Sequence, residues 1–220
     1  VYKKARENLD KLREGGFLRR DDSPCYYIYE LTMDGRTQTG LCGCASVDDY
    51  INNVIKKHEL TRADKERDRI RHVDACDANT GPIFLTYKDS DKINSIVGNV
   101  KSSAAPVYDF VSDDIRHRVW VIADKGICDE ITSLFADVPA LYIADGHHRA
   151  ASAVAVGKMR REKDPSYTGK EDFNFFLAVA FPASELKILD YNRVVKDLNG
   201  LSKEEFIRKI SEKFIVESAF

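Results

Sequence analysis

The sequence lacks an apolar run of the roughly 20 residues that a membrane span requires, so it predicts no membrane partner. It also lacks an excess of either charge, because 34 Lys and Arg stand against 36 Asp and Glu, a formal net charge of −2. Proteins that coat nucleic acids generally carry a clear basic excess. The sequence therefore argues against a nucleic-acid partner, although a local basic patch is compatible with this balance.

A disulfide framework is missing as well. The five cysteines are odd in number and irregularly spaced, and Cys42-Gly43-Cys44 is too tight for the usual zinc pairing. We interpret them as buried or half-buried thiols of a cytoplasmic protein. The chain begins at Val1, without Met and directly in a helical pattern, and we interpret it as an internal fragment of a longer protein.

Hydrophobic residues make up 43% of the 220 residues and charged residues 32%, the balance of an ordinary globular protein with a sizeable core. Apolar periodicity predicts alternating helices and strands, with a hairpin turning at Asp34-Gly35. The expected helices are 1–12, 46–57, 62–74, 91–97, 128–135, 146–156 and 202–214; the expected strands are 25–31, 37–42, 82–87, 107–111, 116–123, 139–144, 173–181 and 186–190.

This alternation predicts an α/β (α+β) fold with a mixed sheet and flanking helices. We expect residues 1–90 to form an N-terminal hairpin and helical part that packs on a core at residues 91–220. The polar segment 158–172 reads as a long mobile loop.

One turn concentrates functional side chains. An apolar run at residues 140–144 ends abruptly at Asp145-Gly146, and His147-His148-Arg149 opens a small-residue helix. The free N–H groups and the positive dipole of a helix start attract anions, and glycine lets the backbone approach a ligand closely. The histidines add donors, and Arg149 can hold a phosphate with two hydrogen bonds. The sequence therefore predicts a phosphate-binding turn at residues 145–149.

Two other interpretations of this turn are open. Asp-Gly between a strand and a helix is a common helix cap, and Arg149 could simply pair with a surface carboxylate. Asp145, His147 and His148 are also metal-ligand types, but adjacent histidines point in different directions and no helical His-x-x-x-His pair supports them. We expect Asp145 to bind only Mg²⁺ that arrives with a nucleotide.

The segment Ile143-Ala144-Asp145-Gly146-His147-His148-Arg149 resembles the hallmark of an uncharacterised conserved family with a ParB/sulfiredoxin-like nucleotide-binding domain, related to free serine kinases that use ADP or ATP. Lys57-His58-Glu59-Leu60-Thr61, the residues Lys65, Asp68 and Arg69, and residues 79–87 are also similar. The likeness covers most of residues 20–198. It implies a ParB/sulfiredoxin-like core, with ATP or ADP and Mg²⁺ bound at the turn.

The resemblance extends the candidate site beyond the turn. Where the family pattern leads us to expect a His-Arg pair, this chain has Asn192-Arg193, so Arg193 remains available for a phosphate or a carboxylate. His58 and Glu59 read either as a helix end, where a histidine favours the dipole, or as a second wall of the site. Lys65 and Arg69, with Arg62, could face phosphate or water. Asp74 and Asp77 read as turn residues, and Asn79 is left open.

The leading hypothesis is an enzyme that transfers a phosphoryl group from ATP or ADP to a small hydroxyl substrate such as free serine. Gly146, His147, His148, Arg149, His58, Lys65 and Arg193 would bind the nucleotide, with Asp145 as base or magnesium ligand and Glu59 as the second candidate. The alternative is a non-catalytic, ParB-like nucleotide switch. A sulfiredoxin-like redox ATPase would need a cysteine in the turn, where this chain has histidines. A homo-oligomer is left open.

Overall fold

Eight strands pair in one mixed sheet in the computed structural model, which describes residues 1–60, 63–190 and 192–217. Their order is β3-β7-β4-β8-β2-β1-β6-β5, in which β3 with β7 and β4 with β8 are parallel and the other neighbours are antiparallel. The predicted α/β class with a mixed sheet is confirmed. The strands are β1 (Tyr26–Met33), β2 (Arg36–Ser46), β3 (Ile55–Lys56), β4 (Ile83–Tyr87), β5 (Tyr108–Ser112), β6 (Ile115–Ile122), β7 (Leu141–Asp145) and β8 (Phe175–Pro182).

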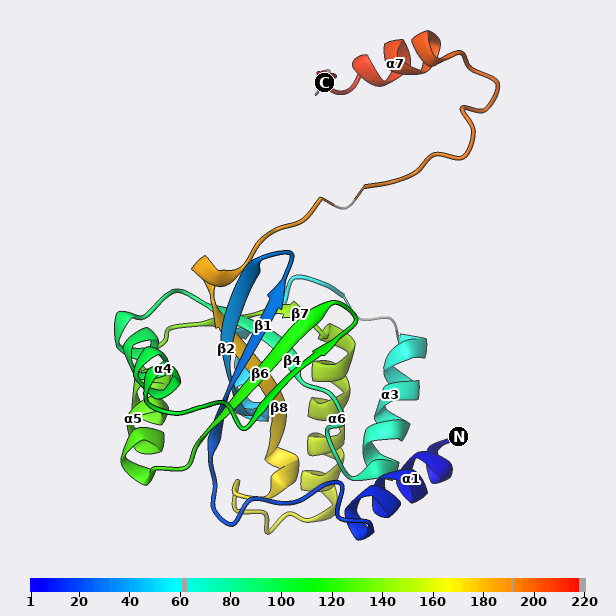
Figure 1. Ribbon diagram of the computed structural model, residues 1–220. Coiled ribbons are helices and arrows are strands. Elements are labelled where there is room, and N and C mark those ends of the chain that lie inside the picture. Colours follow the sequence, from blue (N-terminus) through cyan, green and yellow to red (C-terminus); the bar gives the residue numbers. More distant parts are fainter. Residues whose placement is uncertain (61–62, 191, 218–220) are drawn as a thin grey trace. The chain divides into compact units, whose positions relative to one another are not determined.

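Helices cover both faces of this sheet (Figure 1). α4 and α5 lie on one side, and α6 lies on the other, where α3 packs on α6 and α1 packs on α3. The helices are α1 (Tyr2–Glu14), α2 (Val47–Ile51), α3 (Ala63–Cys76), α4 (Asp91–Ser103), α5 (Lys125–Ala136), α6 (His147–Lys163) and α7 (Lys203–Ser211), with short 3₁₀ turns η1 (Asp172–Asn174) and η2 (Ala183–Glu185). None of them is long and apolar enough to cross a bilayer within the described ranges.

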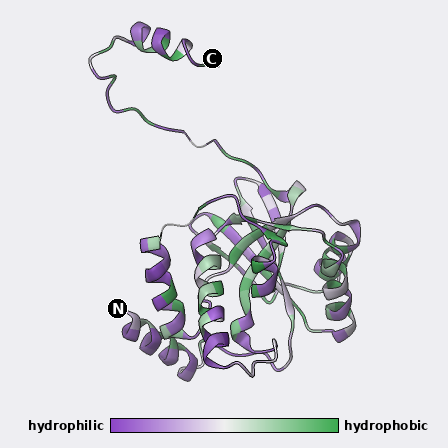
Figure 2. Ribbon diagram, turned by 180° about the vertical axis from the view of Figure 1, so that it is seen from behind, coloured by the Kyte–Doolittle hydropathy of each residue, from purple (hydrophilic) through white to green (hydrophobic). Residues whose placement is uncertain are grey.

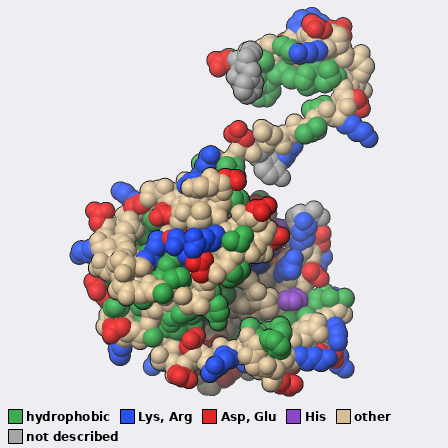
Figure 3. All heavy atoms as spheres, viewed as in Figure 1, with side chains coloured by type: hydrophobic (Ala, Val, Ile, Leu, Met, Phe, Trp, Pro, Cys, Tyr) green, Lys and Arg blue, Asp and Glu red, His purple; other side chains and the backbone are tan. Residues whose placement is uncertain are grey.

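Hydropathy separates the layers (Figure 2). Hydrophobic residues gather on the strands and along α6, whereas α1 and α3 are largely hydrophilic, as expected for outer helices. The face shown in Figure 3 intersperses acidic and basic side chains, α3 included, in keeping with the near-neutral charge. The core is therefore built around the sheet and α6, and α3 adds a charged outer wall.

The predicted hairpin is confirmed. β1 and β2 pair from Tyr27↔Cys42 down to Met33↔Arg36, and the two residues between them, Asp34 and Gly35, have φ of +50° and +73°. Positive φ at both central residues matches the right-handed twist of the strands, and Asp and Gly tolerate it. This turn sets the register between β1 and β2, and the pairing of β1 with β6 and of β2 with β8 places the hairpin inside the sheet.

α6 packs on the sheet through small side chains. Ala150, Ala153 and Val154 are buried, and so is Gly157. A Cβ placed on Gly157 would lie 2.6 Å from the carbonyl oxygen of Phe173, a distance that real side chains do not tolerate. The absence of a side chain at this position therefore lets α6 approach the segment that leads into β8.

Two predicted helices have different ends. Ser46 caps α2 as expected, through a 3.0 Å hydrogen bond from the Asp48 N–H, but the helix ends at Ile51 and not at Lys57. Asn53 takes φ of +58°, a left-handed conformation that asparagine tolerates at helix ends, and the chain then enters β3. α4, by contrast, continues past Val97 to Ser103.

The expected mobile loop at 158–172 is wrong in its first part, because α6 continues to Lys163. Arg161 donates to Asn174 at 2.6 Å and to Asp48 at 2.6 Å, and Arg160 is paired with Asp77. These arginines anchor the last turn, so its polarity reflects ion pairs and not a loop. Beyond it, Glu171 accepts the Thr168 and Gly169 N–H groups, and these bonds lower the pKa of Glu171 to about 2.

The expected strand at 186–190 is also wrong, since those residues join no sheet and Ile188 is almost fully exposed. The contacts within the chain separate two compact units, Val1–Leu186 and Lys187–Phe220. The second unit contains α7, whose Ser202 and Glu205 form a reciprocal capping box. Strands from both sides of residue 90 pair in the sheet of the first unit, and the domain division at residue 90 stays a prediction.

Gly157 on α6 tests the packing of that helix, and Gly98 on α4 is the control. Replacing each with alanine should change the free energy of unfolding in opposite directions. Gly157→Ala should lower the free energy of unfolding by about 1–3 kcal/mol, because its methyl group meets a backbone carbonyl. Gly98→Ala on α4 has no atom within 4 Å of its new methyl group and should raise that free energy by about 0.5–1 kcal/mol. Urea unfolding measures both, and equal effects of the two changes would contradict this account of α6.

Candidate functional site

The predicted turn stands at the junction of β7 and α6. β7 ends at Asp145, Gly146 is the N-cap of α6 in a left-handed conformation with φ of +95°, and the helix begins at His147. No side chain caps this helix, and its first turn contains no acidic residue. The first N–H groups of α6 are therefore open to a ligand at the positive end of the helix dipole.

Arg149 is held in place by the last residue of β7 and by the residue that precedes β4. Its Nη2 donates to Asp145 Oδ2 and its Nη1 to the carbonyl oxygen of Pro82, both at 2.7 Å. A Cβ on Gly146 would come within 3.2 Å of the guanidinium, so glycine is needed here for the approach of Arg149 as well as for the positive φ. The pairing of Arg149 with a nearby carboxylate, one of the two open interpretations, thus occurs, and it also orients the guanidinium beside the turn.

His147 is the most enclosed member of the turn. It is 5% exposed, its Nδ1 lies 3.4 Å from Glu59 Oε2, and the ring of His58 meets its ring edge-on at 4.4 Å between centroids. Burial, and next the neighbouring His58, lower the pKa of His147 below its ordinary 6.5, against the opposing charge of Glu59. His147 is accordingly neutral at pH 7 and can donate its Nδ1 proton to Glu59.

Two ring nitrogens of the turn are buried without a hydrogen-bond partner among the described residues, Nε2 of His147 and Nδ1 of His148. The carbonyl oxygen of His148, by contrast, accepts a hydrogen bond from Ser152 Oγ at 2.6 Å. An unpaired buried polar atom costs free energy, so each one calls for an explanation, of which a functional role is one. Two hydrogen-bonding nitrogens of the turn are therefore not used by contacts among the described residues.

A cleft of about 770 Å³ opens beside this turn, between α6 and α3. The turn supplies all of residues 145–149, Glu59 comes from the segment after β3, and α3 supplies Lys65 and Arg69 at helical i, i+4 spacing. The structure thus brings together Asp145, Gly146, His147, His148, Arg149, Glu59 and Lys65, with His58 against the ring of His147.

For some residues of the predicted site, the structure gives a different location or does not describe them. His58 follows β3 and not a helix, so its interpretation as a helix-end histidine is wrong, because α2 already ends at Ile51. Arg193 belongs to the Lys187–Phe220 unit, and its role stays a prediction. Thr61 and Arg62 lie outside the described residues. Sequence reasoning missed Asp64, which lines the cleft with Asp68 and could have been found by its i, i+4 spacing.

A resident metal centre is not indicated by the donor set, since the described residues contain no group of three or more His, Cys, Asp or Glu side chains placed to hold an ion. Mg²⁺ that arrives with a nucleotide needs only one or two carboxylates beside the phosphates. Asp145, 72% exposed in its side chain at the rim of the cleft, fits that smaller requirement.

The fold and the cleft first define a class, that of mixed α/β proteins with a polar cleft at the start of a sheet-packed helix. The chain belongs to the family described as "Protein of unknown function (DUF1015)", which matches residues 1–219. Comparison with curated proteins finds no match, and comparison with solved structures finds none. The expected membership of an uncharacterised conserved family is confirmed, and the relation to ParB, sulfiredoxin and serine kinases stays a prediction.

The buried, neutral His147 predicts a pH dependence of stability. Its pKa is lower in the folded chain than in the unfolded chain, so below about pH 6.5 the unfolded chain binds a proton that the folded chain does not. The free energy of unfolding should therefore fall as the pH falls from about 7.5 to about 5.5. Urea unfolding at the two pH values should show a smaller loss for His147→Gln than for the unchanged chain.

The matched control is His117→Gln, which removes a histidine from β6 on the other half of the sheet. A His147→Gln variant that loses as much stability on acidification as the unchanged chain would show that this ring does not titrate below its ordinary range.

Proposed function

We propose that this chain is a nucleotide-binding phosphotransferase, which moves a phosphoryl group from ATP or ADP to the hydroxyl group of a small molecule such as free serine. The observation that carries the proposal is the start of α6, where uncapped N–H groups and a left-handed Gly146 border a cleft. Helix starts of this kind bind phosphate through backbone N–H groups and the helix dipole.

The cleft carries both signs of charge, since four carboxylates line it, Glu59, Asp64, Asp68 and Asp145, and three cations line it from two elements. Arg149 stands beside the turn, and Lys65 and Arg69 face it from α3. Phosphoryl transfer depends mainly on positioning and on stabilising the charge of the transferred group, and this arrangement supplies both. Arg149 keeps three further N–H groups beyond its bonds to Asp145 and Pro82, so it can still donate to a phosphate.

Glu59 is the better-placed general base of the two candidates. Its side chain is 60% exposed in the cleft and is oriented by His147, whereas Asp145 Oδ2 is already taken by Arg149. In the proposed reaction the substrate oxygen bonds to the terminal phosphorus, the hydroxyl proton passes to Glu59, and the bond to the leaving nucleotide breaks with its electron pair. Mg²⁺ held by Asp145 and the phosphates would neutralise charge on the transferred group.

Isothermal titration with ATP, ADP and CTP, with and without Mg²⁺, tests the binding half of this proposal. Arg149→Ala should weaken nucleotide binding by about tenfold or more, since it removes a charged phosphate donor. The matched control is Arg116→Ala, which removes an arginine of similar exposure that pairs with Asp109 on the β5–β6 hairpin. No binding by the unchanged chain, or equal losses in both variants, would remove the nucleotide proposal.

Turnover tests the chemical half. With ATP or ADP and serine or a panel of related hydroxyl compounds, ³¹P NMR should detect a phosphate monoester. Glu59→Gln should lower kcat by about 100-fold or more, as expected for loss of a general base, while nucleotide affinity stays within about threefold. A comparable loss in Asp145→Asn alone would assign the base to Asp145. Nucleotide binding with no turnover of any acceptor would favour a regulatory module over an enzyme.

A further inference from the structure

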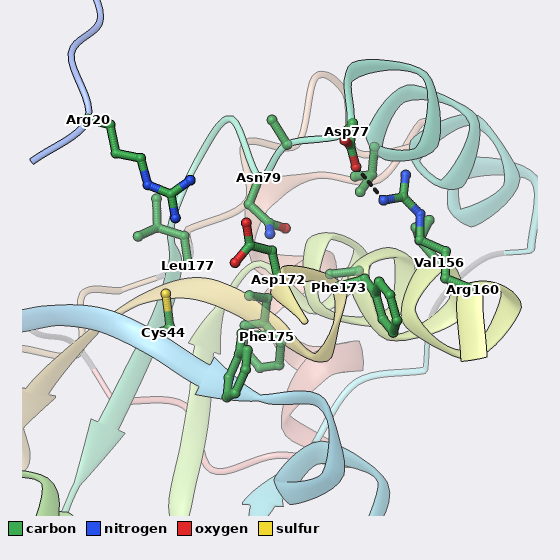
Figure 4. A pocket seen from close by; sticks show the side chains of 14 residues that line it. Arg20, Cys44, Asp77, Asn79, Val156, Arg160, Asp172, Phe173, Phe175 and Leu177 are labelled. Atoms are coloured by element: carbon green, nitrogen blue, oxygen red, sulfur yellow. Dashed lines mark hydrogen bonds and ion pairs between the residues drawn. The ribbon is translucent and has the colours of Figure 1, made fainter. Parts of the chain in front are cut away.

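A second cavity, of about 340 Å³, lies between α3, α6 and the start of β8 (Figure 4). Its polar wall carries Asp172, Asn79 and Arg20, whose side chains point into the same space in Figure 4. Its apolar wall includes the rings of Phe173 and Phe175. The cavity thus joins flat aromatic surface to hydrogen-bonding groups, the pattern of a small-molecule subsite.

Some polar side chains near this wall are engaged in ion pairs, whereas Asp172 and Asn79 are directed into the cavity. Asp77 is bound to Arg160, which also reaches Asp74 at 3.3 Å, so these side chains brace α3 against α6. Asp172 and Asn79 face the cavity instead. A carboxylate accepts hydrogen bonds, and an amide both donates and accepts them. Together they match the edge of a nucleobase, which alternates N–H donors with ring-nitrogen acceptors, while aromatic rings and guanidinium groups stack on its faces.

This cavity and the phosphate cleft adjoin a common neighbouring hollow. A smaller hollow of about 110 Å³ lies between them and shares Arg69 and Arg149 with the cleft. It shares Val73 and Asn79 with the second cavity. The three spaces are therefore neighbours beside α3 and α6, and the middle one is lined by the segment that leads from α3 into β4.

The spacing of the two spaces along α6 suits a nucleotide. Arg149 borders the phosphate cleft and Val156 borders the second cavity on the same face of α6, and seven residues of helix separate them by about 10 Å at 1.5 Å per residue. That separation is comparable with the distance between the outer phosphate and the base of an extended nucleoside triphosphate.

We infer that the cavity lined by Asp172, Asn79 and Phe175 holds the nucleoside part of the nucleotide whose phosphates bind at the start of α6. The inference rests on the proposed function and adds where the base lies and which residues recognise it. Asp172 and Asn79 hydrogen-bond the edge of the base, and a phenylalanine ring of the apolar wall stacks on its face.

Cys44 provides a direct reporter of occupancy, because it is an exposed residue that lines the second cavity and not the phosphate cleft. Burial of the sulfur, and next the charge of Asp172, raise the pKa of this thiol, so alkylation is best run at mildly alkaline pH. Cys25 and Cys128, which line neither space, serve as internal references in the same sample.

The experiment measures the rate of alkylation of Cys44 by N-ethylmaleimide in the full chain, residue by residue with mass spectrometry. Saturating ATP should slow the alkylation of Cys44 by about tenfold while Cys25 and Cys128 change little. Inorganic tripolyphosphate occupies only the phosphate turn, so at saturation it should leave the Cys44 rate within about twofold.

A variant separates recognition of the base from binding of the phosphates. Asp172→Asn should weaken ATP binding by about tenfold, the effect expected for one hydrogen bond to a charged group, and leave tripolyphosphate binding unchanged. The matched control is Asp137→Asn at the end of α5, which should bind both ligands as the unchanged chain does.

The outcomes distinguish the two proposals. ATP that binds with calorimetric saturation, without protecting Cys44 and with full affinity in Asp172→Asn, would overturn the inference and leave the phosphate turn intact. Failure of both ATP and tripolyphosphate to bind would overturn the proposed function and the inference together. Protection by ATP and not by tripolyphosphate, with the selective loss in Asp172→Asn, would establish the subsite.

Discussion

The left-handed conformation of Gly146 is the constraint on which the rest of the site depends. It turns the chain from β7 into α6 within one residue, so the start of a buried helix faces outward at the end of a strand. The same missing side chain leaves room for the guanidinium of Arg149, which in turn ties Asp145 to the Pro82 carbonyl. One glycine thus orients the helix dipole, an arginine and a carboxylate together.

Close packing holds α6 in position along its length, beyond the turn at Gly146. Small buried residues let the helix lie against the sheet, and Gly157 allows contact with the backbone at Phe173. At the far end, Arg160 and Arg161 bind carboxylates of α3 and α2. α6 is therefore firmly packed, and both the cleft at its start and the second cavity are lined by its residues. The spaces beside its start and beside its later turns are therefore held at a fixed distance, which is what the proposed binding of one ligand across both requires.

Local chemistry explains which expectations succeeded. Asp34-Gly35 and the Asp145-Gly146 turn carry their conformational preference within two residues, and both were predictable from the chain alone. The helix expected at 46–57 and the loop expected at 158–172 failed because their patterns depend on partners. The apolar residues Val54 and Ile55 fit a helical pattern in the sequence, but in the structure Ile55 belongs to β3, which pairs with β7. The charge of Arg161 is typical of a solvated loop, but in the structure it binds Asp48.

The sequence by itself determined the mixed α/β class, the hairpin, and the phosphate-binding candidates of the turn, because each follows from short-range periodicity or from adjacent residues. Only the tertiary structure decided what stands across from the turn. It brought Glu59 to His147 and aligned α3 beside α6, and it joined Asn79 to Asp172 in a second cavity. These contacts depend on the order of the strands in the sheet. Local sequence patterns do not predict contacts between residues so distant in sequence.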